Sequence, residues 1–434
     1  MNDRKKTERP PVSRRDFIKA SATASVSLAA LSTQVRAVFA AGSDGVRVGL
    51  IGCGGRGRYD TTNCLNAAPG VELVAMGDLF QDCLETTRER LKEQLGDKIK
   101  VTEETSFVGF DAYAKVLQCD VDLVILTEPP HFRPEHLKAA IEAGKHAFIE
   151  KPVAVDPVGV RTVIEAAELA EQKNLTLVAG TQARRMPARV EMMKRIHSGD
   201  LGQLIAGQCI RTGGAMRDWR PLERQPEMSD MEWQIRRWLF HTWLSGDFIA
   251  EMHVHELDVV NWAMGSPPVK CYGMGGRQAR TEPEYGDLYD HFAVEYEYPN
   301  GVRIAYMGSQ IDGCSTKTFE RFTGTKGSAY TDWATSRIEG PRPYEYDGPE
   351  VNPCLQQHAD QIRAIRNNDR LNEGRRIAES SLTAIMGRIS AYTGRELSWK
   401  WVLNASQLDL RPPQYELGDL PFGPIAIPGQ TQLI

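Results

Sequence analysis

The chain has 434 residues, of which 41% are hydrophobic and 25% charged, with 38 Gly and 24 Pro. This composition excludes collagen-like, coiled-coil and wholly disordered proteins, and the length suits two or three domains. The first forty residues carry 8 Lys and Arg against 3 Asp and Glu, which leaves 44 against 54 in the remainder. So acidic a remainder argues against nucleic acid as a partner and favours small solutes.

A basic start leads into the sequence SRRDFIK at residues 13–19, followed by an uncharged, small-residue stretch at 20–34. Candidate cleavage sites, VRA and VFA, end at positions 37 and 40. The pattern resembles a twin-arginine export signal and predicts that residues 1–40 are a signal peptide. It further predicts a periplasmic or otherwise exported protein that meets the twin-arginine translocase during export. The alternative is an amphipathic N-terminal helix with a chance arginine pair.

The eight cysteines are scattered and form no Cys-x-x-Cys pair. This spacing is typical neither of a zinc site nor of a secreted disulfide scaffold, and we predict no metal. It suits a chain that folds in reducing cytoplasm. Twin-arginine export carries folded proteins, so a cofactor loaded before export would account for both features.

A short apolar run at 46–51 predicts a buried parallel strand that leads directly into the pattern G-x-G-x-x-G at 52–57. A helical stretch follows, so the glycines would let the backbone and the helix N-terminus approach a pyrophosphate. A second strand at 71–76 is followed by Gly77 and Asp78, and Asp78 lies 21 residues past Gly57. A carboxylate there binds the adenosine ribose and repels a 2′-phosphate, which favours NAD over NADP. The alternative is a glycine-rich turn with a solvated Asp.

The alternation of strand and helix continues with a helix at 81–95, a strand at 121–126, a helix at 135–143 and a strand at 146–150. It predicts an α/β fold with a doubly wound parallel sheet over residues 45–170, whose ligands bind beyond the carboxyl ends of the strands. The loops after the last two strands should therefore face the nicotinamide. The predicted cofactor contacts are Gly52, Gly54, Gly55, Arg56, Gly57, Asp78, Thr127, Pro129, His131, Glu150 and Lys151.

The run EAGKHAFIEKP at 142–152 resembles the Gfo/Idh/MocA oxidoreductases, the family of glucose–fructose oxidoreductase and inositol dehydrogenase. The likeness extends over nearly all of the chain beyond residue 40, including the glycine pattern, a helix around 247–264 and the segment 378–388. It implies a C-terminal α+β domain with a large, mostly antiparallel sheet. It also implies a homodimer or homotetramer, and a glutamine, Gln182, near the cofactor or substrate, although Gln182 could equally be a plain loop amide.

The sequence supports this second domain, which we place at 171–400 with a tail at 401–434. The strands 292–298 and 302–309 flank a Pro-Asn-Gly turn, as in a hairpin, and a further hairpin is expected over 319–331. Two closing helices, about 355–367 and 376–393, are expected to pack back on the first domain.

The predicted helix at 247–264 places Glu251, His255 and Asp258 on one face. The family usually carries Asp-x-x-x-His-x-x-Asp here, so Glu251 is a departure. We predict that His255 is the acid/base and that Lys151 binds the hydroxyl oxygen, with Asp258 or Glu251 orienting the imidazole. Which of Lys151 and His255 takes the proton stays open. The alternatives are that His255 is a core histidine, Lys151 a surface lysine and Asp258 a structural aspartate.

Other positions depart from the family pattern or suggest alternatives. Glu128 and Arg133 stand where Thr and His are usual near the nicotinamide loop. His253 lies ~200° around the helix from His255, so the two should not share a metal. Five of the eight tryptophans crowd residues 219–262 beside arginines, where they could stack on sugars or form core or interface. These positions are Trp219, Trp233, Trp238, Trp243 and Trp262, with Arg217, Arg220, Arg236 and Arg237.

The resemblance implies an NAD-dependent oxidoreductase that acts on the hydroxyl or carbonyl group of a sugar or polyol. An exported enzyme would have to keep its NAD and reoxidise NADH with a second carbonyl substrate, or run a cycle that is redox-neutral overall. The second case gives the alternative function, an NAD-dependent glycoside hydrolase or lyase with a transient 3-keto sugar. A third is a non-catalytic carbohydrate-binding protein that keeps NAD for structure. Lys151 favours the oxidoreductase.

Overall fold

The computed structural model describes residues 45–214 and 224–434. The predicted signal peptide at 1–40 lies outside these residues, as do Arg217, Trp219 and Arg220. Within the two described ranges, no helix has the length and apolar character that crossing a membrane requires. All eight cysteines fall inside these ranges as free thiols.

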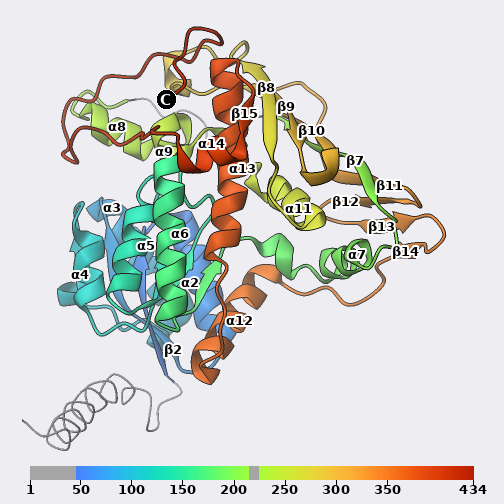
Figure 1. Cartoon of the computed structure of the whole chain (residues 1–434). Helices are drawn as coiled ribbons and strands as arrows, with labels where there is room; N and C mark the ends of the chain where they lie inside the picture. Colours follow the sequence, from blue (N-terminus) through green and yellow to red (C-terminus); the bar gives the residue numbers. More distant parts are fainter. Residues whose placement is uncertain (1–44, 215–223) are drawn as a thin grey trace, which may run out of the picture. The chain divides into compact units, whose positions relative to one another are not determined.

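Residues 46–179 form a six-stranded sheet in the order β3-β2-β1-β4-β5-β6, and all of its strand pairs are parallel (Figure 1). The strands are β1 (Val46–Ile51), β2 (Val71–Asp78), β3 (Ser106–Val108), β4 (Leu123–Leu126), β5 (His146–Ile149) and β6 (Leu177–Ala179). The helices are α2 (Gly55–Ala67), α3 (Gln81–Leu95), α4 (Ala112–Gln118), α5 (Arg133–Glu142) and α6 (Pro157–Gln172). Every residue of β4 and β5 is buried, as strands covered on both faces require. The predicted Rossmann sheet is confirmed.

The second sheet has nine strands in the order β14-β13-β12-β11-β7-β10-β9-β8-β15. Only the central pair β7–β10 is parallel, and the other pairs are antiparallel, as predicted. The strands are β7 (Leu204–Gly213), β8 (Lys270–Gly276), β9 (His291–Glu297), β10 (Arg303–Gln310), β11 (Lys317–Gly324), β12 (Ser328–Thr331), β13 (Ser336–Glu339), β14 (Tyr344–Glu345) and β15 (Leu397–Ser398). The remaining helices are α7 (Pro187–His197), α8 (Asp230–Arg236), α9 (Thr242–Ser245), α10 (Phe248–Glu251), α11 (Val254–Met264), α12 (Pro353–Asn367), α13 (Gly374–Thr393) and α14 (Trp399–Asn404).

The hairpin β9–β10 shows how the sequence sets one face of this sheet. Asn300, in the Pro-Asn-Gly turn, has a φ of 68°, which asparagine tolerates well. The turn pairs Ile304 with Tyr296, and these two residues and Tyr306 are buried. The alternate residue Met307 is exposed on the outer face. Strict alternation therefore gives one covered face and one open face.

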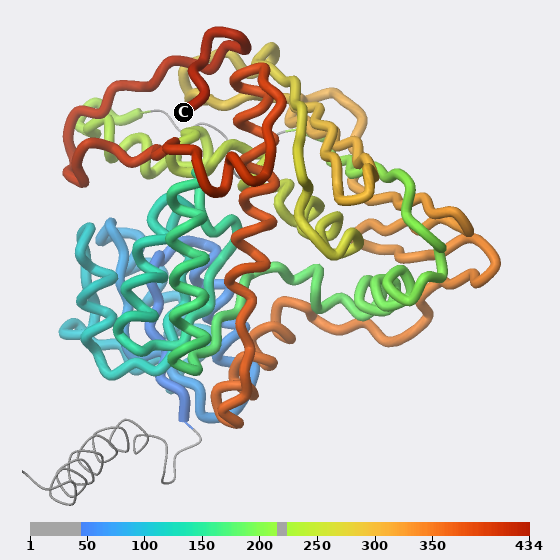
Figure 2. The backbone as a smooth tube through the Cα atoms, in the orientation of Figure 1, coloured from blue at the N-terminus to red at the C-terminus, as the bar shows by residue number. Residues whose placement is uncertain are grey.

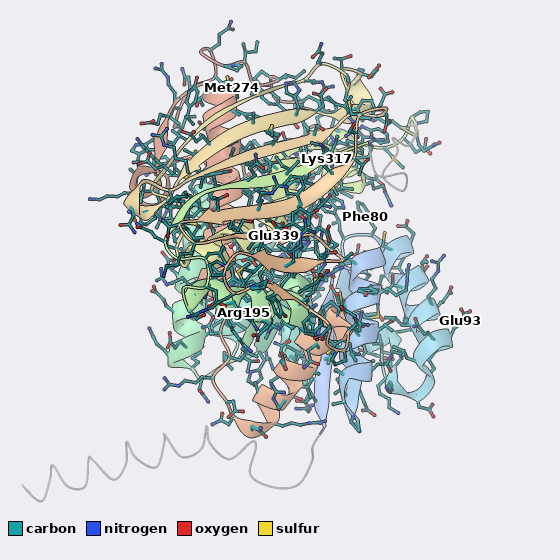
Figure 3. The ribbon with its side chains drawn as sticks, turned by 90° about the vertical axis from the view of Figure 1, so that its right-hand side faces the viewer. Phe80, Glu93, Arg195, Met274, Lys317 and Glu339 are labelled. Carbon is teal, nitrogen blue, oxygen red and sulfur yellow. The ribbon has the colours of Figure 1, made fainter. Side chains whose placement is uncertain are left out.

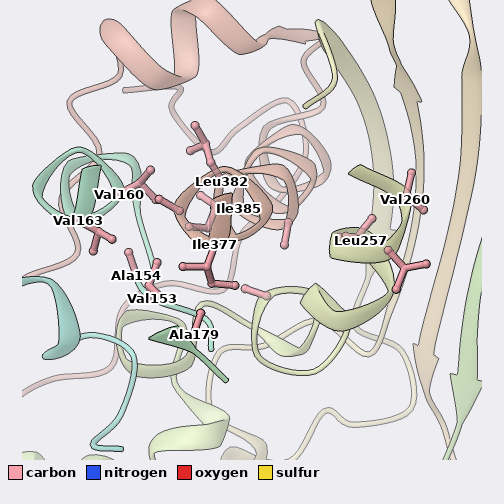
Figure 4. Close-up of a cluster of buried hydrophobic side chains, with 14 of the residues drawn as sticks. Val153, Ala154, Val160, Val163, Ala179, Leu257, Val260, Ile377, Leu382 and Ile385 are labelled. Atoms are coloured by element: carbon pink, nitrogen blue, oxygen red, sulfur yellow. The ribbon is translucent and has the colours of Figure 1, made fainter. Parts of the chain in front are cut away.

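Helix α13 lies between the two sheet domains, and most of its residues are buried. Its side chains Ile377, Leu382 and Ile385 belong to a buried hydrophobic cluster (Figure 4). The helix packs against α6 of the first domain and against α11 and β8 of the second. Ile377 and Leu382 lie in a single hydrophobic cluster with Val160 of α6 and Leu257 of α11. Because this core is continuous, it fixes the position of the α10–α11 segment relative to the first sheet.

The tail from residue 405 onward first passes the first domain and then runs over α8 and α9 back toward the second domain (Figure 2). Its backbone accepts a hydrogen bond from Met231 N at Gly418 O, and Leu420 O accepts one from Gln234 Nε2. On the first domain, the Asp156 carboxylate accepts from Leu410 N at 2.9 Å. The tail therefore ties residues 230–236 to the Rossmann domain.

Asp247 is a buried acid that connects three segments. Its φ is 68°, and its carboxylate accepts hydrogen bonds from Phe248 N at 2.5 Å, Tyr289 N at 3.0 Å and Tyr392 Oη at 2.6 Å. Burial raises the pKa of Asp247 from 3.8 to about 6, although these three donors favour the ionised form.

The raised pKa of Asp247 predicts a loss of stability with rising pH. Between pH 3.8 and about 6 the folded state holds a proton that the unfolded state has released, so the free energy of unfolding falls across this window. Asp247→Asn should remove this pH dependence, because asparagine does not titrate. The difference in free energy of unfolding, wild type minus Asp247→Asn, should therefore decrease by roughly 2–3 kcal/mol from about pH 4 to about pH 7. Denaturant unfolding of both proteins across this range measures it, and a constant difference would contradict it.

Candidate active site

The glycine loop leads directly from β1 into α2. A Cβ at Gly52, whose φ is +92°, would collide with the Glu128 backbone, and a Cβ at Gly57 would collide with Gly52 O. By contrast, a Cβ at Gly54 or at Gly55 would meet no atom within 4 Å. Two glycines therefore allow close packing, while the other two leave open space at the N-terminus of α2, which suits a pyrophosphate.

Asp78 lies at the end of β2 beside this loop. Its carboxylate accepts hydrogen bonds from Cys53 N at 2.6 Å and Phe80 N at 2.8 Å. Burial raises the pKa of Asp78, while the two backbone donors oppose the rise. A carboxylate that is held this way and still has lone pairs free can accept from ribose hydroxyls.

A cavity of about 330 Å³ opens at the carboxyl edge of the first sheet. Five predicted cofactor residues line it, namely Gly52, Gly54, Asp78, Thr127 and Pro129. Its aromatic lining comes from Phe80, Phe110, Tyr113, Phe132, His136 and Trp238. Ile235 and Arg236 of the α8 segment complete it from the other domain, and Arg236 lies over the Phe80 ring at 3.8 Å. Its volume, its aromatic lining and the Asp78 carboxylate fit the adenosine half of a dinucleotide. The loop after β4, which we expected to face the nicotinamide, also lines this cavity.

Arg56 and Glu150, two further predicted cofactor residues, contact each other. Arg56 Nη2 donates to Glu150 Oε1 at 2.5 Å, and its Nε donates to the buried Asp60 at 3.0 Å. A Cβ at Gly180 would collide with the Glu150 carboxylate, so a side chain there would displace that carboxylate. In this structure both residues position the glycine loop against β5.

Lys151 follows β5 and reaches the α10 segment. Its Nζ donates to Glu251 O at 2.5 Å and to Glu251 Oε1 at 2.9 Å, and both side chains are largely buried. Arg133 Nη1 donates to Pro152 O at 2.7 Å and thereby holds the turn that carries the lysine. Burial raises the pKa of Glu251, while Lys151 and Arg133 act to lower it. Residues from the two domains thus meet in one ion pair.

His255 is buried close to this pair. Burial lowers the pKa of His255 well below 6.5, and the nearby charges of Lys151 and Arg211 lower it further. The imidazole is therefore neutral at physiological pH and able to accept a proton. Its Nδ1 has no hydrogen-bond partner in the described part of the chain, and its ring meets Trp333 edge-on at 5.8 Å.

The helix predicted at 247–264 is interrupted, which corrects the expected geometry. α10 ends at Glu251 and α11 begins at Val254, with Met252 and His253 in the break. His253 N bonds back to Phe248 O, and its Nδ1 lies 2.6 Å from Tyr306 Oη. Glu251 thus ends α10, and its side chain pairs with Lys151.

Asp258 also differs from expectation, because it does not orient the imidazole. Its carboxylate accepts from Arg184 Nε at 2.8 Å, Arg376 Nη1 at 3.1 Å and Ser380 Oγ at 2.7 Å. Burial would raise its pKa, but the two guanidinium groups dominate and hold that pKa below the ordinary value. Asp258 is the centre of a buried ion-pair cluster that joins α11 to α13.

His131 and Gln182 lie apart from the cavity lining. His131 Nε2 is 2.8 Å from Tyr415 Oη of the tail, and burial lowers the pKa of His131 to about 3. Gln182 Oε1 is buried without a protein partner among the described residues. Nothing in the sequence pointed to Tyr415, since its partner lies 284 positions away.

Of the four tryptophans of this segment that lie within the described ranges, Trp233 is buried and the other three are half-buried. Trp238 and Trp243 contribute to a small apolar cluster with Phe80, Phe110 and Leu420. Trp262 stacks under the Arg184 guanidinium at 4.7 Å. No group of three His, Cys, Asp or Glu side chains in residues 45–214 and 224–434 is arranged to hold a metal ion.

Comparison with known proteins identifies the family to which the chain belongs. A family model described as an oxidoreductase family with an NAD-binding Rossmann fold matches residues 46–181, and a GFO/IDH/MocA C-terminal domain model matches residues 190–330. Together these models cover more than half of the chain, which therefore belongs to the GFO/IDH/MocA oxidoreductase family.

Two curated relatives are similar over much of the chain. A "Glycosyl hydrolase family 109 protein" of Streptomyces coelicolor is 28% identical over 69% of this chain and 63% of its own length. "Inositol 2-dehydrogenase 3" of Saccharopolyspora erythraea is 28% identical over 60% of this chain and 65% of its own. The chain thus spans just under two thirds of the length of each. A solved structure of levoglucosan dehydrogenase with NADH, 16% identical, covers 82% of this chain and 99% of its own with a TM-score of 0.66, which shows the shared fold.

Proposed function

We propose that this protein is an NAD-dependent oxidoreductase that transfers a hydride between a tightly bound nicotinamide cofactor and a hydroxyl or carbonyl carbon of a sugar or polyol. The observation that carries the proposal is the ion pair between Lys151 and Glu251, which joins the two domains at the carboxyl edge of the Rossmann sheet, with His255 buried four residues further along the chain. The oxidoreductase family and a relative named as an inositol dehydrogenase support it.

The residues divide the work of the reaction. The cofactor supplies the hydride acceptor when it is bound. Lys151 Nζ donates to the substrate oxygen and stabilises the developing alkoxide, while the neutral His255 accepts the hydroxyl proton. Glu251 holds the lysine, and Arg133 holds the turn behind it. The orphaned polar atoms Glu251 Oε2, His255 Nδ1 and Gln182 Oε1 suit a substrate rich in hydroxyls.

Mass spectrometry of the protein as purified tests the captive cofactor, because NAD(H) should co-elute. A screen of sugars and polyols for NADH formation, or for coupled reduction of a second carbonyl compound, tests the chemistry. We also propose export by the twin-arginine pathway, which would require a retained cofactor. The α8 segment and the tail, which cover the cavity side of the Rossmann domain, support such retention.

Asp78 supports NAD rather than NADP as the cofactor. We expect NADH to bind at least about tenfold more tightly than NADPH, because the carboxylate repels a 2′-phosphate. Asp78→Asn should narrow this preference to within about threefold, because the neutral amide does not repel a 2′-phosphate. Fluorescence titration of both reduced dinucleotides measures it, with Asp97→Asn, at the surface, as the control. An unchanged preference in D78N would contradict the assignment.

Glycoside cleavage through a transient 3-keto sugar is the second candidate, favoured by relatives named glycosyl hydrolase family 109 proteins. Release of an aryl alcohol from aryl glycosides without added NAD would support it. Net formation of NADH from a glycoside whose glycosidic bond stays intact would exclude glycoside cleavage.

We further propose a homodimer or homotetramer. The outer face of the nine-stranded sheet, seen in Figure 3, exposes apolar side chains that would be buried by a partner. Ile205, Tyr272, Met274 and Met307 are 47–61% exposed. Size-exclusion chromatography with light scattering tests the state.

A further inference from the structure

Glu128 lies in the loop after β4 and lines the cavity assigned to the adenosine half of the cofactor. The side chain is only 6% exposed. Its Oε1 is 3.0 Å from His136 Nδ1, whereas its Oε2 has no hydrogen-bond partner among the described residues. A buried carboxylate oxygen without a donor is costly, so a donor from a ligand is expected at this position.

The surroundings of Glu128 suit a flat ring. The His136 imidazole stacks on the Tyr113 ring at 3.9 Å with an interplanar angle of 18°. Phe132 is nearly parallel to His136 at 21°, and Phe110 lines the same cavity. Planar walls favour stacking of a base, whereas a ribose would gain little from them.

The two carboxylates of the cavity lie at the ends of different strands, so we expect them to contact different parts of the ligand. Asp78 follows β2 and is held by the amides of Cys53 and Phe80, beside the glycine loop. Glu128 follows β4 and is held by His136 of α5. Since the ribose hydroxyls are assigned to Asp78, the donor left for Glu128 is on the base.

We infer that Glu128 reads the base of the dinucleotide by accepting a hydrogen bond from the 6-amino group of adenine. This inference rests on the proposed function, because it assumes that a nicotinamide dinucleotide occupies the cavity. It assigns to Glu128 a part in specificity, at a position where the sequence departs from the usual threonine of the family.

Nicotinamide hypoxanthine dinucleotide tests the inference, because a carbonyl oxygen replaces the 6-amino group and would face the carboxylate. The wild-type protein, freed of bound cofactor, should bind NADH about tenfold to a hundredfold more tightly than the reduced hypoxanthine analogue. Glu128→Gln should bring the two dissociation constants within about threefold, because an amide can accept from an amine or donate to a carbonyl. Glu142→Gln, at the exposed last residue of α5, should keep the wild-type ratio.

Fluorescence titration gives both constants without turnover, so no substrate is needed. If both dinucleotides bind and Glu128→Gln leaves the ratio unchanged, Glu128 does not read the base and the inference is wrong while the proposed function stands. An equal loss of affinity for both would likewise overturn it. If neither dinucleotide binds to the wild-type protein, the proposed function itself fails.

Discussion

Replacing Lys151 with methionine is expected to lower kcat by about 10³-fold, because the substrate oxygen loses its cationic donor as negative charge develops. Nζ approaches Glu251 O and Oε1 at 2.5 and 2.9 Å, so it is already held at the meeting point of the two domains. NADH affinity should change less than about threefold, because the lysine does not line the cavity assigned to the adenosine half. Steady-state kinetics and fluorescence titration separate the two effects.

Two further variants make the Lys151 experiment decisive. Lys151→Arg keeps the charge opposite Glu251 and therefore the fold, but its larger head group should leave kcat low. Lys138→Met, on the surface of α5, should behave as wild type. Activity that survives in both Lys151 variants would show that Lys151 is not the donor to the substrate oxygen.

Replacing Asp258 with alanine is expected to lower the free energy of unfolding by about 3–5 kcal/mol. The change leaves Arg184 and Arg376 without their shared buried carboxylate, and Ser380 without its acceptor. Asp369→Ala, at an exposed position, should cost less than about 0.5 kcal/mol. Denaturant unfolding near neutral pH measures both.

The pH dependence of the Asp258 effect has a definite sign. The folded-state pKa lies below the unfolded value, so the stabilisation is present above about pH 4 and is lost as pH falls through the folded pKa. The difference between wild type and Asp258→Ala should therefore shrink in acid. A cost below about 1 kcal/mol at neutral pH would show that the arginines find other partners.

Much of the first domain could be predicted from local sequence. Fully apolar runs such as β4 predict buried parallel strands, and the glycines at 52–57 predict the turn, because both signals lie within a few residues. The second sheet followed from the resemblance and from turn signals such as Asn300. Lys151 and Glu251 were both named as candidate residues, yet their direct contact crosses 100 positions.

The sequence by itself determined the alternation of elements, the glycine loop with Asp78, and the residue types that hydride-transfer chemistry needs. Only the tertiary structure decided where those side chains point. At the break between α10 and α11, His253 contacts Tyr306 of β10. Asp258 pairs with two arginines from other elements. Helical periodicity is a property of neighbours along the chain, whereas a buried charge takes whichever partner the folded core brings within reach.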